Sequence, residues 1–482
     1  MIGRVLDRAL RERPGAEALV TRSRRLTYAE FDAEANRAAH ALLALGVRPG
    51  EPVAASLPQD ADVVLAFHGA MRIGAVWVGI NRALAPPEKA YQLADSGAAL
   101  YLSDDTATPW REALAAASTE PVGLDVDPDA PAGIAYTSGT TGHPKGVVHS
   151  QRNLLLPGAV AVAARGYGPG LRKGDCLPLT ILNLQVLTTL LTAQAGGCCI
   201  VMDRIDALGV TAWIAREQVT TFNGPPPLLH DLAARADVDP ADLASLTEVW
   251  SGGADCPESL RAAFADRVGV PVLTTYGLSE APTLVAMDPV DGRHVPGASG
   301  VPLPHLQVRI ATAEGAEVPP GETGEVCVSA AVDGDWAGEY RPMLGYRNRP
   351  EATAAVLRAG ELRTGDLGFL DGEGFLHIRD RTSLVILRGG ANVYPAEVER
   401  VLLEHPAVVA CAVVGVPDER LGERVVAAVQ VVGGETDDDD LAAHCRASLA
   451  RYKVPERFLV VDAFERNAMG KIARPAVAAL FG

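Results

Sequence analysis

Several features that would place a protein in a specialised class are missing from this 482-residue sequence. No CxxC pair and no paired histidine spacing occur, so the seven cysteines give no zinc signature, and we expect them to be buried thiols. No apolar run is long enough to cross a bilayer, and residues 1–15 read as an amphipathic helix rather than as a signal peptide. We therefore expect a cytoplasmic protein with no membrane insertion.

Positive charge is also scarce. Lys and Arg total 43 against 60 Asp and Glu, which gives a formal net charge of −17. This excess of negative charge opposes binding to a phosphate backbone, so nucleic acid is not expected as a partner. The content of 48% apolar and 21% charged residues is that of a globular protein, and the length calls for two or more domains.

Short β-branched segments alternate with helical patterns along most of the chain. Residues 52–56 precede a helical pattern over 60–73, and a helical pattern over 88–95 precedes a strand over 100–103. This alternation is typical of βαβ units around parallel sheets. Residues 26–44 predict a helix with a capping box, because Thr27 stands at the N-cap, Glu30 follows three residues later, and Gly46 ends the pattern.

The last hundred residues have a different pattern. We expect strands over 384–387, 408–414, 425–432 and 458–461, and helices from Pro395 and over 441–449. The first of these helices carries Val398, Val401 and Leu402 on one face. The acidic run before the second suits a solvated loop and a helix N-terminus. The pattern predicts a compact α+β module that begins near residues 380–383.

The segment YTSGTTGHPKG, residues 136–146, follows a predicted strand end at 134–137. A polyphosphate needs glycines that let backbone N–H groups approach closely, together with hydroxyl donors and a cation. The segment supplies all three through Thr137, Ser138, Gly139, Thr140, Thr141, Gly142 and Lys145. The Walker order GxxxxGK[ST] does not occur, which argues against a P-loop NTPase. The alternative for the segment is a plain Ser/Gly/Thr turn.

This segment resembles the signature loop of the adenylate-forming superfamily, which includes acyl-CoA synthetases, peptide-synthetase adenylation domains and firefly luciferase. Other segments resemble the motifs of that superfamily in the same order, from about residue 26 to the C-terminus. They are SGGA at 251–254, YGLSE at 276–280, GETGE at 321–325, GY at 345–346, TGD at 364–366, Arg381 and GK at 470–471.

The resemblance implies a role for each matched residue. Gly253 and Ala254 would lie beside adenine, Tyr276 would stack on it, and Gly277 and Ser279 belong to the same motif. Glu280 would hold Mg²⁺, Asp366 and Arg381 would contact the ribose, and Lys471 would bridge phosphate and carboxylate oxygens. Lys471, Glu280 and Thr141 are the catalytic candidates. Taken singly, Asp366 is also compatible with a turn, Glu280 with a surface acid and Lys471 with a solvated tail.

The resemblance also implies a fold and a reaction. The expected fold is α/β: a large N-terminal domain of stacked α/β sheets with a small β-barrel-like subdomain, over 1–380, and a mobile α+β lid over 384–482. The hinge would lie near Ser383, and Gly389 and Gly390 would line a thiol tunnel. The expected reaction uses ATP and Mg²⁺ to activate a small carboxylic acid as an acyl-adenylate, releases pyrophosphate, and transfers the acyl group to CoA or to the phosphopantetheine of an acyl carrier protein.

Two segments depart from the pattern. Ile181 stands where family members carry a histidine near the acyl carbonyl, and Glu465-Arg466-Asn467 replaces Pro-x-Thr before the final lysine. Two alternatives therefore stay open: an adenylating enzyme with a non-thiol acceptor, and a nucleotide-binding protein without turnover, against which the intact charged motifs argue. Candidate residues of the acid pocket are Asn183, Leu187, Asn223 and Thr275, although each asparagine is also compatible with an ordinary structural role.

Overall fold

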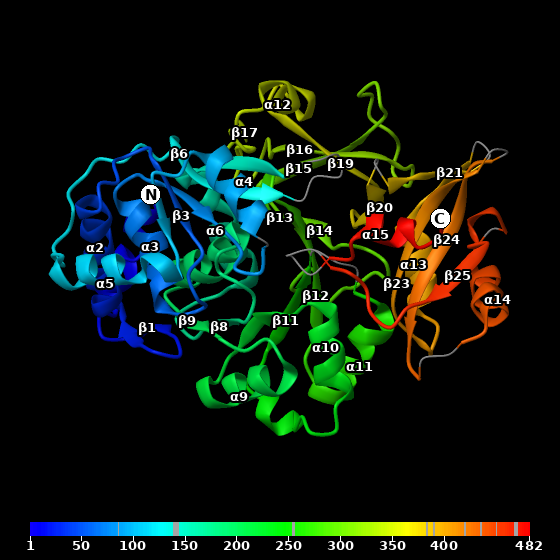
Figure 1. Ribbon diagram of the computed structural model, residues 1–482, viewed down its shortest axis with the longest axis horizontal. Helices are drawn as coiled ribbons and strands as arrows, with labels where there is room; N and C mark the ends of the chain where they lie inside the picture. The colour runs from blue at the N-terminus through cyan, green and yellow to red at the C-terminus, as the bar shows by residue number, and fades with distance from the viewer. Residues whose placement is uncertain are drawn as a thin grey trace.

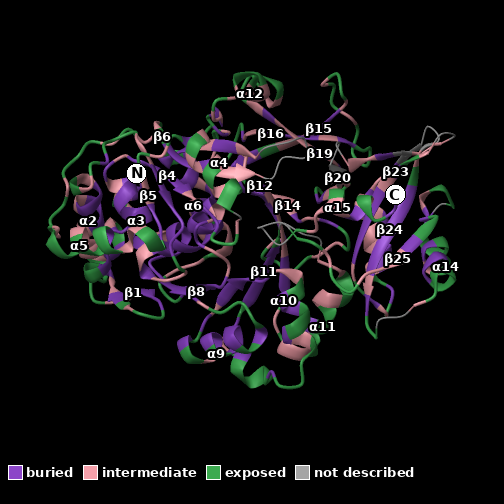
Figure 2. Ribbon diagram, in the orientation of Figure 1, coloured by how far each residue is buried: buried purple, intermediate pink, exposed green. Residues whose placement is uncertain are grey.

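The computed structural model describes residues 1–482 except 85, 138–143, 253–255, 382–383, 389–390, 419–420, 434–435, 450 and 467–470, and only the backbone of 380, 381, 387, 391, 392 and 422. Within this described part the strands form four sheets. In Figure 1 the N-terminal sheets (blue to green) and the C-terminal sheet (orange) lie at opposite ends of the molecule. Figure 2 shows that buried residues concentrate in these sheets and in the helices between them.

The largest sheet has nine strands in the order β14-β13-β12-β11-β10-β8-β9-β1-β2. The strands from β12 to β1 run parallel to their neighbours, and the two edges are antiparallel. The bounds are β1 Glu17–Val20, β2 Arg25–Thr27, β8 Arg172–Asp175, β9 Cys198–Val201, β10 Thr221–Asn223, β11 Glu248–Gly252, β12 Val272–Leu278, β13 Ala281–Met287 and β14 Val301–Pro302. In such sheets, ligands bind beyond the carboxyl ends of the parallel strands.

The second sheet has six strands in the order β17-β7-β6-β4-β3-β5. The bounds are β3 Pro52–Ala55, β4 Val76–Gly79, β5 Leu100–Leu102, β6 Pro131–Thr137, β7 Lys145–Ser150 and β17 Gly345–Tyr346. β6 and β7 form an antiparallel hairpin, and β17 comes from far along the chain to pair with β7. The main apolar core joins the two sheets, with Leu19 and Cys199 from the first and Ala55 and Trp77 from the second.

Helices cover and separate these two sheets, as Figure 1 shows. The α-helices are α1 Asp7–Glu12, α2 Tyr28–Ala44, α3 Ala61–Arg72, α4 Pro86–Ser96, α5 Ala107–Ala116, α6 Gln151–Arg165, α7 Leu182–Leu184, α8 Leu191–Ala195, α9 Ala207–Glu217, α10 Pro226–Ala234, α11 Glu258–Val268 and α12 Pro350–Val356. Short 3-10 turns are η1 Ile2–Arg4, η2 Asp104–Thr106 and η4 Pro240–Leu243. A π-helical segment, η3 Gln185–Leu190, joins α7 to α8. Such segments are rare and are frequent at functional sites.

Two smaller sheets follow. The third is antiparallel, in the order β15-β16-β19-β18 with β20 on β19: β15 Leu306–Ala311, β16 Gly324–Ala330, β18 Leu357–Arg358, β19 Glu361–Leu370 and β20 Leu376–Arg381. The fourth, in the C-terminal domain, has the order β22-β21-β24-β23 with β25 on β24: β21 Ile386–Arg388, β22 Ala391–Val393, β23 Val408–Asp418, β24 Gly422–Val431 and β25 Arg457–Val460. Its helices are α13 Pro395–Leu403, α14 Asp438–Ser448, η6 Arg451–Lys453 and α15 Arg474–Ala479.

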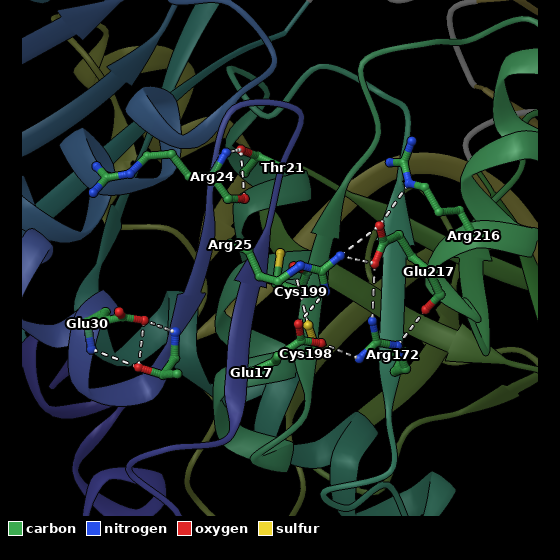
Figure 3. Close-up of polar contacts among 11 residues, drawn as sticks. Glu17, Thr21, Arg24, Arg25, Glu30, Arg172, Cys198, Cys199, Arg216 and Glu217 are labelled. Atoms are coloured by element: carbon green, nitrogen blue, oxygen red, sulfur yellow. Dashed lines mark hydrogen bonds and ion pairs between the residues drawn. The ribbon is translucent and has the colours of Figure 1, made fainter.

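A network of charged side chains links strands β1, β2 and β8 of the large sheet to helix α9. Figure 3 shows Glu17, Arg25, Arg172, Arg216 and Glu217 pointing toward one another from β1, β2, β8 and α9. Glu217 pairs with Arg25 at 2.8 Å and with Arg216 at 2.9 Å. Burial alone would raise the pKa of Glu217, but the hydrogen bonds from these two arginines lower it overall. The network therefore stabilises the edge of the sheet through an ionised carboxylate.

The predicted fold class is confirmed as mixed α/β with large sheets and a C-terminal domain that contains antiparallel strands. The capping box is confirmed, because the backbone N–H of Thr27 donates to Glu30 at 2.8 Å and that of Glu30 donates to Thr27 at 3.3 Å. The helix begins at Tyr28, since Leu26 belongs to β2. The strand predicted at 384–387 begins two residues later, at Ile386, where pairing with β22 starts.

Candidate active site

The β6–β7 hairpin carries the predicted phosphate loop at its tip. Thr137 ends β6 and lies opposite Lys145, the first residue of β7, and its hydroxyl donates to the Lys145 carbonyl at 3.5 Å. Antiparallel pairing thus fixes both ends of the loop. Five of the predicted phosphate-binding residues lie outside the described residues: Ser138, Gly139, Thr140, Thr141 and Gly142.

Lys145, Tyr346 and Glu280 lie together beside this hairpin. The Lys145 ammonium is 4.9 Å from the centre of the Tyr346 ring, a cation–π contact. The Tyr346 hydroxyl donates to Glu280 Oε1 at 2.8 Å. The pairing of β17 with β7 positions Tyr346 there. The sequence motif GY was interpreted only as structural, so the link that Tyr346 makes between the loop lysine and the predicted metal ligand was missed.

A buried histidine contacts the backbone of the turn that carries Glu280. His149, on β7, donates from Nε2 to the Ser279 carbonyl at 2.6 Å, while its buried Nδ1 has no partner among the residues that the structure describes. Burial lowers the pKa of His149 to about 4. The imidazole is therefore neutral near pH 7, and it fixes the backbone next to Glu280 without adding charge to the site.

Glycine is required at position 277 because the two strands of this turn approach each other closely. A Cβ atom at Gly277 would lie 1.5 Å from the Thr283 carbonyl oxygen. The same holds on the neighbouring strand, where a Cβ at Gly252 would lie 2.1 Å from Thr275 Oγ1. The motif glycines therefore serve close packing of backbone, which is what lets β11 and β12 end side by side.

Tyr276 and Asp366 are 90 residues apart in sequence and in direct contact. The Tyr276 hydroxyl donates to Asp366 Oδ2 at 2.7 Å, and Asp366 is only 4% exposed. The Thr364 hydroxyl accepts from the backbone N–H of Asp366 at 3.1 Å, so the TGD turn is closed on itself. Asp366 also lies opposite Arg381 in the β19–β20 ladder, which brings the two predicted ribose contacts to one place in the backbone.

The acid-pocket candidates lie on two strands of the large sheet and on the helical segments over 182–190. Asn223 ends β10 beside Trp250, and Thr275, in the middle of β12, donates to the Ser251 carbonyl at 3.2 Å. Leu187 is in the π-helical segment and shares an apolar cluster with Trp250. Asn183, in α7, is half-buried, while the predicted residues Gly253 and Ala254 lie outside the described residues.

A buried polar group next to these residues was not predicted. Lys173 and Asp175, both on β8, are fully buried, and both contact Asn223. Thr188, in the π-helical segment, donates to Asp175 Oδ2 at 2.7 Å. The signal was present in the sequence as RKGD, a polar tetrapeptide directly before the segment that contains Ile181.

The C-terminal candidates are described only in part. Lys471 is exposed, and an isolated antiparallel bridge pairs Arg466 with Ile472. Ser383, Gly389 and Gly390 lie outside the described residues, so the hinge and the thiol tunnel stay predictions. Across the described chain, none of the helices is both long and apolar enough to span a bilayer, and none of the seven cysteines forms a disulfide.

Glu280 suits a magnesium ion that arrives with a nucleotide. No cluster of three or more His, Cys, Asp or Glu side chains that could hold a metal occurs in the described part of the chain. Mg²⁺ is usually bound by one or two carboxylates together with substrate phosphates, rather than by a full protein cage. A single carboxylate beside the phosphate loop, steadied by the Tyr346 hydroxyl, fits this mode of binding.

The chain matches the AMP-binding enzyme family over residues 6–332 and the AMP-binding enzyme C-terminal domain over 397–471. It is 36% identical to a feruloyl-CoA synthase of Amycolatopsis sp, over 98% of each chain. It is 33% identical to the fatty acid–[acyl-carrier-protein] ligase ScoC of Streptomyces coeruleorubidus, over 96% of this chain and 92% of the relative. Among solved structures, the amide bond synthetase McbA from Marinactinospora thermotolerans aligns with a TM-score of 0.87 and 31% identity, over 100% of both chains.

Proposed function

The chain belongs to the AMP-binding enzyme family, and we propose that it activates a carboxylic acid with ATP as an acyl-adenylate, releases pyrophosphate and passes the acyl group to a thiol. One observation carries the proposal. Lys145, Tyr346 and Glu280 converge at the phosphate hairpin, while the hydroxyl of Tyr276, on β12, meets Asp366, on β19. A cation, a metal ligand and groups for the adenine and the ribose are the parts that an ATP-dependent adenylation needs.

In the first step, a carboxylate oxygen of the acid bonds to the α-phosphorus of ATP. The bond to the bridging oxygen breaks, and pyrophosphate leaves with the electron pair. Because two anions must meet, the protein contributes charge neutralisation and positioning rather than proton transfer. Lys145 and the loop hydroxyls would hold the phosphates, Asp366 and Arg381 would contact the ribose, and Tyr276 would stack on adenine. Mg²⁺ on Glu280 would neutralise charge on the phosphates.

We assign the residues that no contact yet tests by their place in the motifs. Lys471 would supply positive charge at the reacting oxygens from a lid that comprises residues 384–482 and closes on a body of residues 1–380. Ser383 would be the pivot, and Gly389 and Gly390 would line the path of the thiol. A lid is needed because the adenylate is a mixed anhydride that water hydrolyses easily. In the second step, sulfur attacks the acyl carbonyl and AMP leaves with the electron pair.

The thiol can belong to CoA or to an acyl carrier protein, since relatives of both names share about a third of their residues with this chain. A second candidate function, transfer to an amine, is supported by the amide bond synthetase similarity and by Ile181. Ile181 is half-buried, stands at the N-cap position of α7 and packs against the main apolar core. Because its side chain is a hydrocarbon, it offers the acyl carbonyl no hydrogen-bond donor. We further propose a cytoplasmic location for the enzyme.

The test is exchange of labelled pyrophosphate into ATP, dependent on an added carboxylic acid and on Mg²⁺. We expect the wild type to catalyse exchange with at least one acid of a broad panel, and Lys471→Ala to abolish it. Arg235→Ala removes an exposed cation that follows α10 and pairs only with Asp237 among the ion pairs of the described residues; it is the matched control and should leave exchange unchanged. Absence of exchange with every acid would refute the proposal.

The nucleophile that takes the acyl group is then identified in a second assay. The acid that supports exchange is supplied together with CoA, a phosphopantetheinylated carrier protein or a panel of amines. Product analysis by mass spectrometry separates thioester from amide. Thioester as the main product supports the thiol proposal, whereas amide alone would replace it with the second candidate. An adenylate that accumulates with every acceptor would contradict both.

A further inference from the structure

The starting point is a pair of charges inside the large sheet. β8 lies between β9 and β10 in the interior of the sheet, and strands in that position normally read as continuous apolar runs. Here the strand is Arg172-Lys173-Gly174-Asp175, and the Lys173 and Asp175 side chains are both 0% exposed. Burial of a charge costs several kcal/mol unless it is well paired. Lys173 and Asp175 are neighbours on one face of β8, so the contacts of their side chains must compensate the cost of burying both charges.

Both charges meet at the Asn223 side chain. Lys173 Nζ donates to Asn223 Oδ1 at 3.4 Å and lies 4.4 Å from the centre of the Trp250 ring. Asp175 Oδ2 accepts from Asn223 Nδ2 and from the Thr188 hydroxyl, the latter at 2.7 Å. Lys173 has no direct ion pair with any residue that the structure describes, so the asparagine amide stands between the cation and the carboxylate.

This arrangement fixes which way the Asn223 amide points. Its oxygen faces an ammonium group and its nitrogen faces a carboxylate, and the flipped amide would set like polarity against each charge. Burial lowers the pKa of Lys173 to about 8, with Asp175 and Glu248 opposing the shift, so the lysine is still mainly charged near pH 7. Burial also raises the pKa of the Asp175 carboxyl, and the charge of Lys173 and the hydrogen bonds from Thr188 and Asn223 oppose that rise. The orientation is therefore set by an ammonium group on one side and a carboxyl group on the other.

One N–H of Asn223 is left for a ligand. The amide nitrogen carries two hydrogens, and among the described residues Asp175 is its single acceptor. Asn223 is 8% exposed, whereas Lys173 and Asp175 are sealed. Of the three groups, only the asparagine can reach a bound molecule without a rearrangement of the sheet. What the cluster offers is a hydrogen-bond donor, held in a preset direction by two buried charges.

Asn223 is separated from the strand of Tyr276 by β11 alone. It ends β10 next to Trp250, and β11 then continues to Gly252 beside Thr275, one residue before Tyr276. Leu187, in the π-helical segment, packs in the same apolar cluster as Trp250. The Thr188 hydrogen bond to Asp175 ties the π-helical segment to the same charges. Strand β10 and the π-helical segment, which carry the acid-pocket candidates Asn223 and Leu187, are thus joined by a single polar group.

We propose that Asn223 determines acid specificity by donating an N–H to a hydrogen-bond acceptor on the far part of the substrate, and that Lys173 and Asp175 are its positioning residues. The inference rests on the proposed adenylation function. The substrate class is a carboxylic acid with an aryl or alkyl body that carries a distal ether, carbonyl, hydroxyl or ring nitrogen. A plain hydrocarbon acid would leave the oriented N–H buried and unpaired, which is the main cost that a polar site imposes on the wrong substrate.

The test uses pairs of acids of equal size that differ only in the acceptor: 4-methoxycinnamate against 4-ethylcinnamate, 4-methoxybenzoate against 4-ethylbenzoate, and 5-oxohexanoate against 5-methylhexanoate. The readout is the ratio of kcat/KM for pyrophosphate exchange within a pair. Both acids are measured on the same preparation, so a loss of folded enzyme cancels. We expect the wild type to favour the acceptor member by about tenfold or more.

Three variants locate the effect. Asn223→Leu should reduce the ratio to about one, and Lys173→Met should reduce it in part because the amide is then held from one side only. Thr221→Val is the matched control: Thr221 is on the same strand and face, is fully buried, and its hydroxyl has no partner among the described residues. Its ratio should equal that of the wild type.

Failure of the inference and failure of the proposed function are distinguishable. Exchange with a ratio near one in every pair, or an unchanged ratio in Asn223→Leu, would overturn the specificity role while adenylation stands. An unchanged ratio in Lys173→Met would overturn the positioning role. Absence of exchange with any acid would overturn the proposed function and this inference together.

Discussion

The buried imidazole behind the Glu280 turn allows a quantitative prediction about pH and stability. His149 is 1% exposed, and its pKa is lowered by burial to about 4, from about 6.5 for a free histidine. A histidine with a depressed folded-state pKa favours the folded state only while it is neutral. Its contribution is complete above about pH 6.5 and is lost as the pH falls toward 4, since the unfolded chain takes up the proton first.

The magnitude follows from the size of the shift. Each pH unit between the two pKa values costs about 1.4 kcal/mol, so the folded state loses about 2 kcal/mol at about pH 5 relative to about pH 7.5. His149→Gln is the appropriate comparison. A glutamine amide can still donate to the Ser279 carbonyl, and it does not titrate. All other ionisable groups are shared, so their contributions cancel in the difference between the two proteins.

The assay is urea unfolding at the two pH values, followed by tryptophan fluorescence. All five tryptophans precede residue 380, so the signal reports the part of the chain that contains His149. We expect the unfolding free energy of the wild type to fall by about 2 kcal/mol more than that of His149→Gln between the two conditions. Equal losses in the two proteins would show that the histidine is not held neutral, and would refute the account of the turn.

Three further substitutions test the site. Tyr276→Phe removes the donor to Asp366, the proposed ribose ligand, and should raise the KM for ATP in pyrophosphate exchange by about tenfold; an unchanged KM would contradict the assignment. Tyr346→Phe removes the hydroxyl on Glu280 and should raise the Mg²⁺ concentration for half-maximal exchange by about tenfold, whereas an unchanged Mg²⁺ titration would count against it. Gly277→Ala forces a Cβ against the Thr283 carbonyl and should lower the unfolding free energy by about 3 kcal/mol, and wild-type stability would disprove the packing argument.

Local features could be predicted because each needs only a short stretch of sequence. The Thr27 capping box needed only four consecutive residues, and the phosphate hairpin needed only a strand and a Gly-rich segment. The contact between Tyr276 and Asp366 could not be derived from spacing, because it depends on how the third sheet lies against the first. Tyr346 was missed for the same reason: a two-residue strand gives no periodicity to read, and its role exists only through pairing with β7.

The ends of strands could not be predicted exactly either, because they also depend on partners that are distant in sequence. The strand predicted to end at residue 414 continues to Asp418, because β24 offers backbone partners along the whole of β23. The predicted start at residue 384 was wrong because pairing, and not hydropathy, decides where β21 begins. Local apolar pattern indicates that a strand exists, whereas the ladder it joins sets its length.

The acid pocket illustrates why chemistry is easier to read than shape. Adenylation needs charges at fixed points, so few side chains can serve, and Lys145, Glu280 and Asp366 are recognisable in sequence. An apolar pocket can be built from many combinations of residues, so its sequence carries little information about its occupant. The exception arises where a protein buries a charge, because that costs free energy which apolar packing would not. Lys173 and Asp175 are such an exception, and for that reason we propose a ligand chemistry only for the part of the pocket assigned to Asn223.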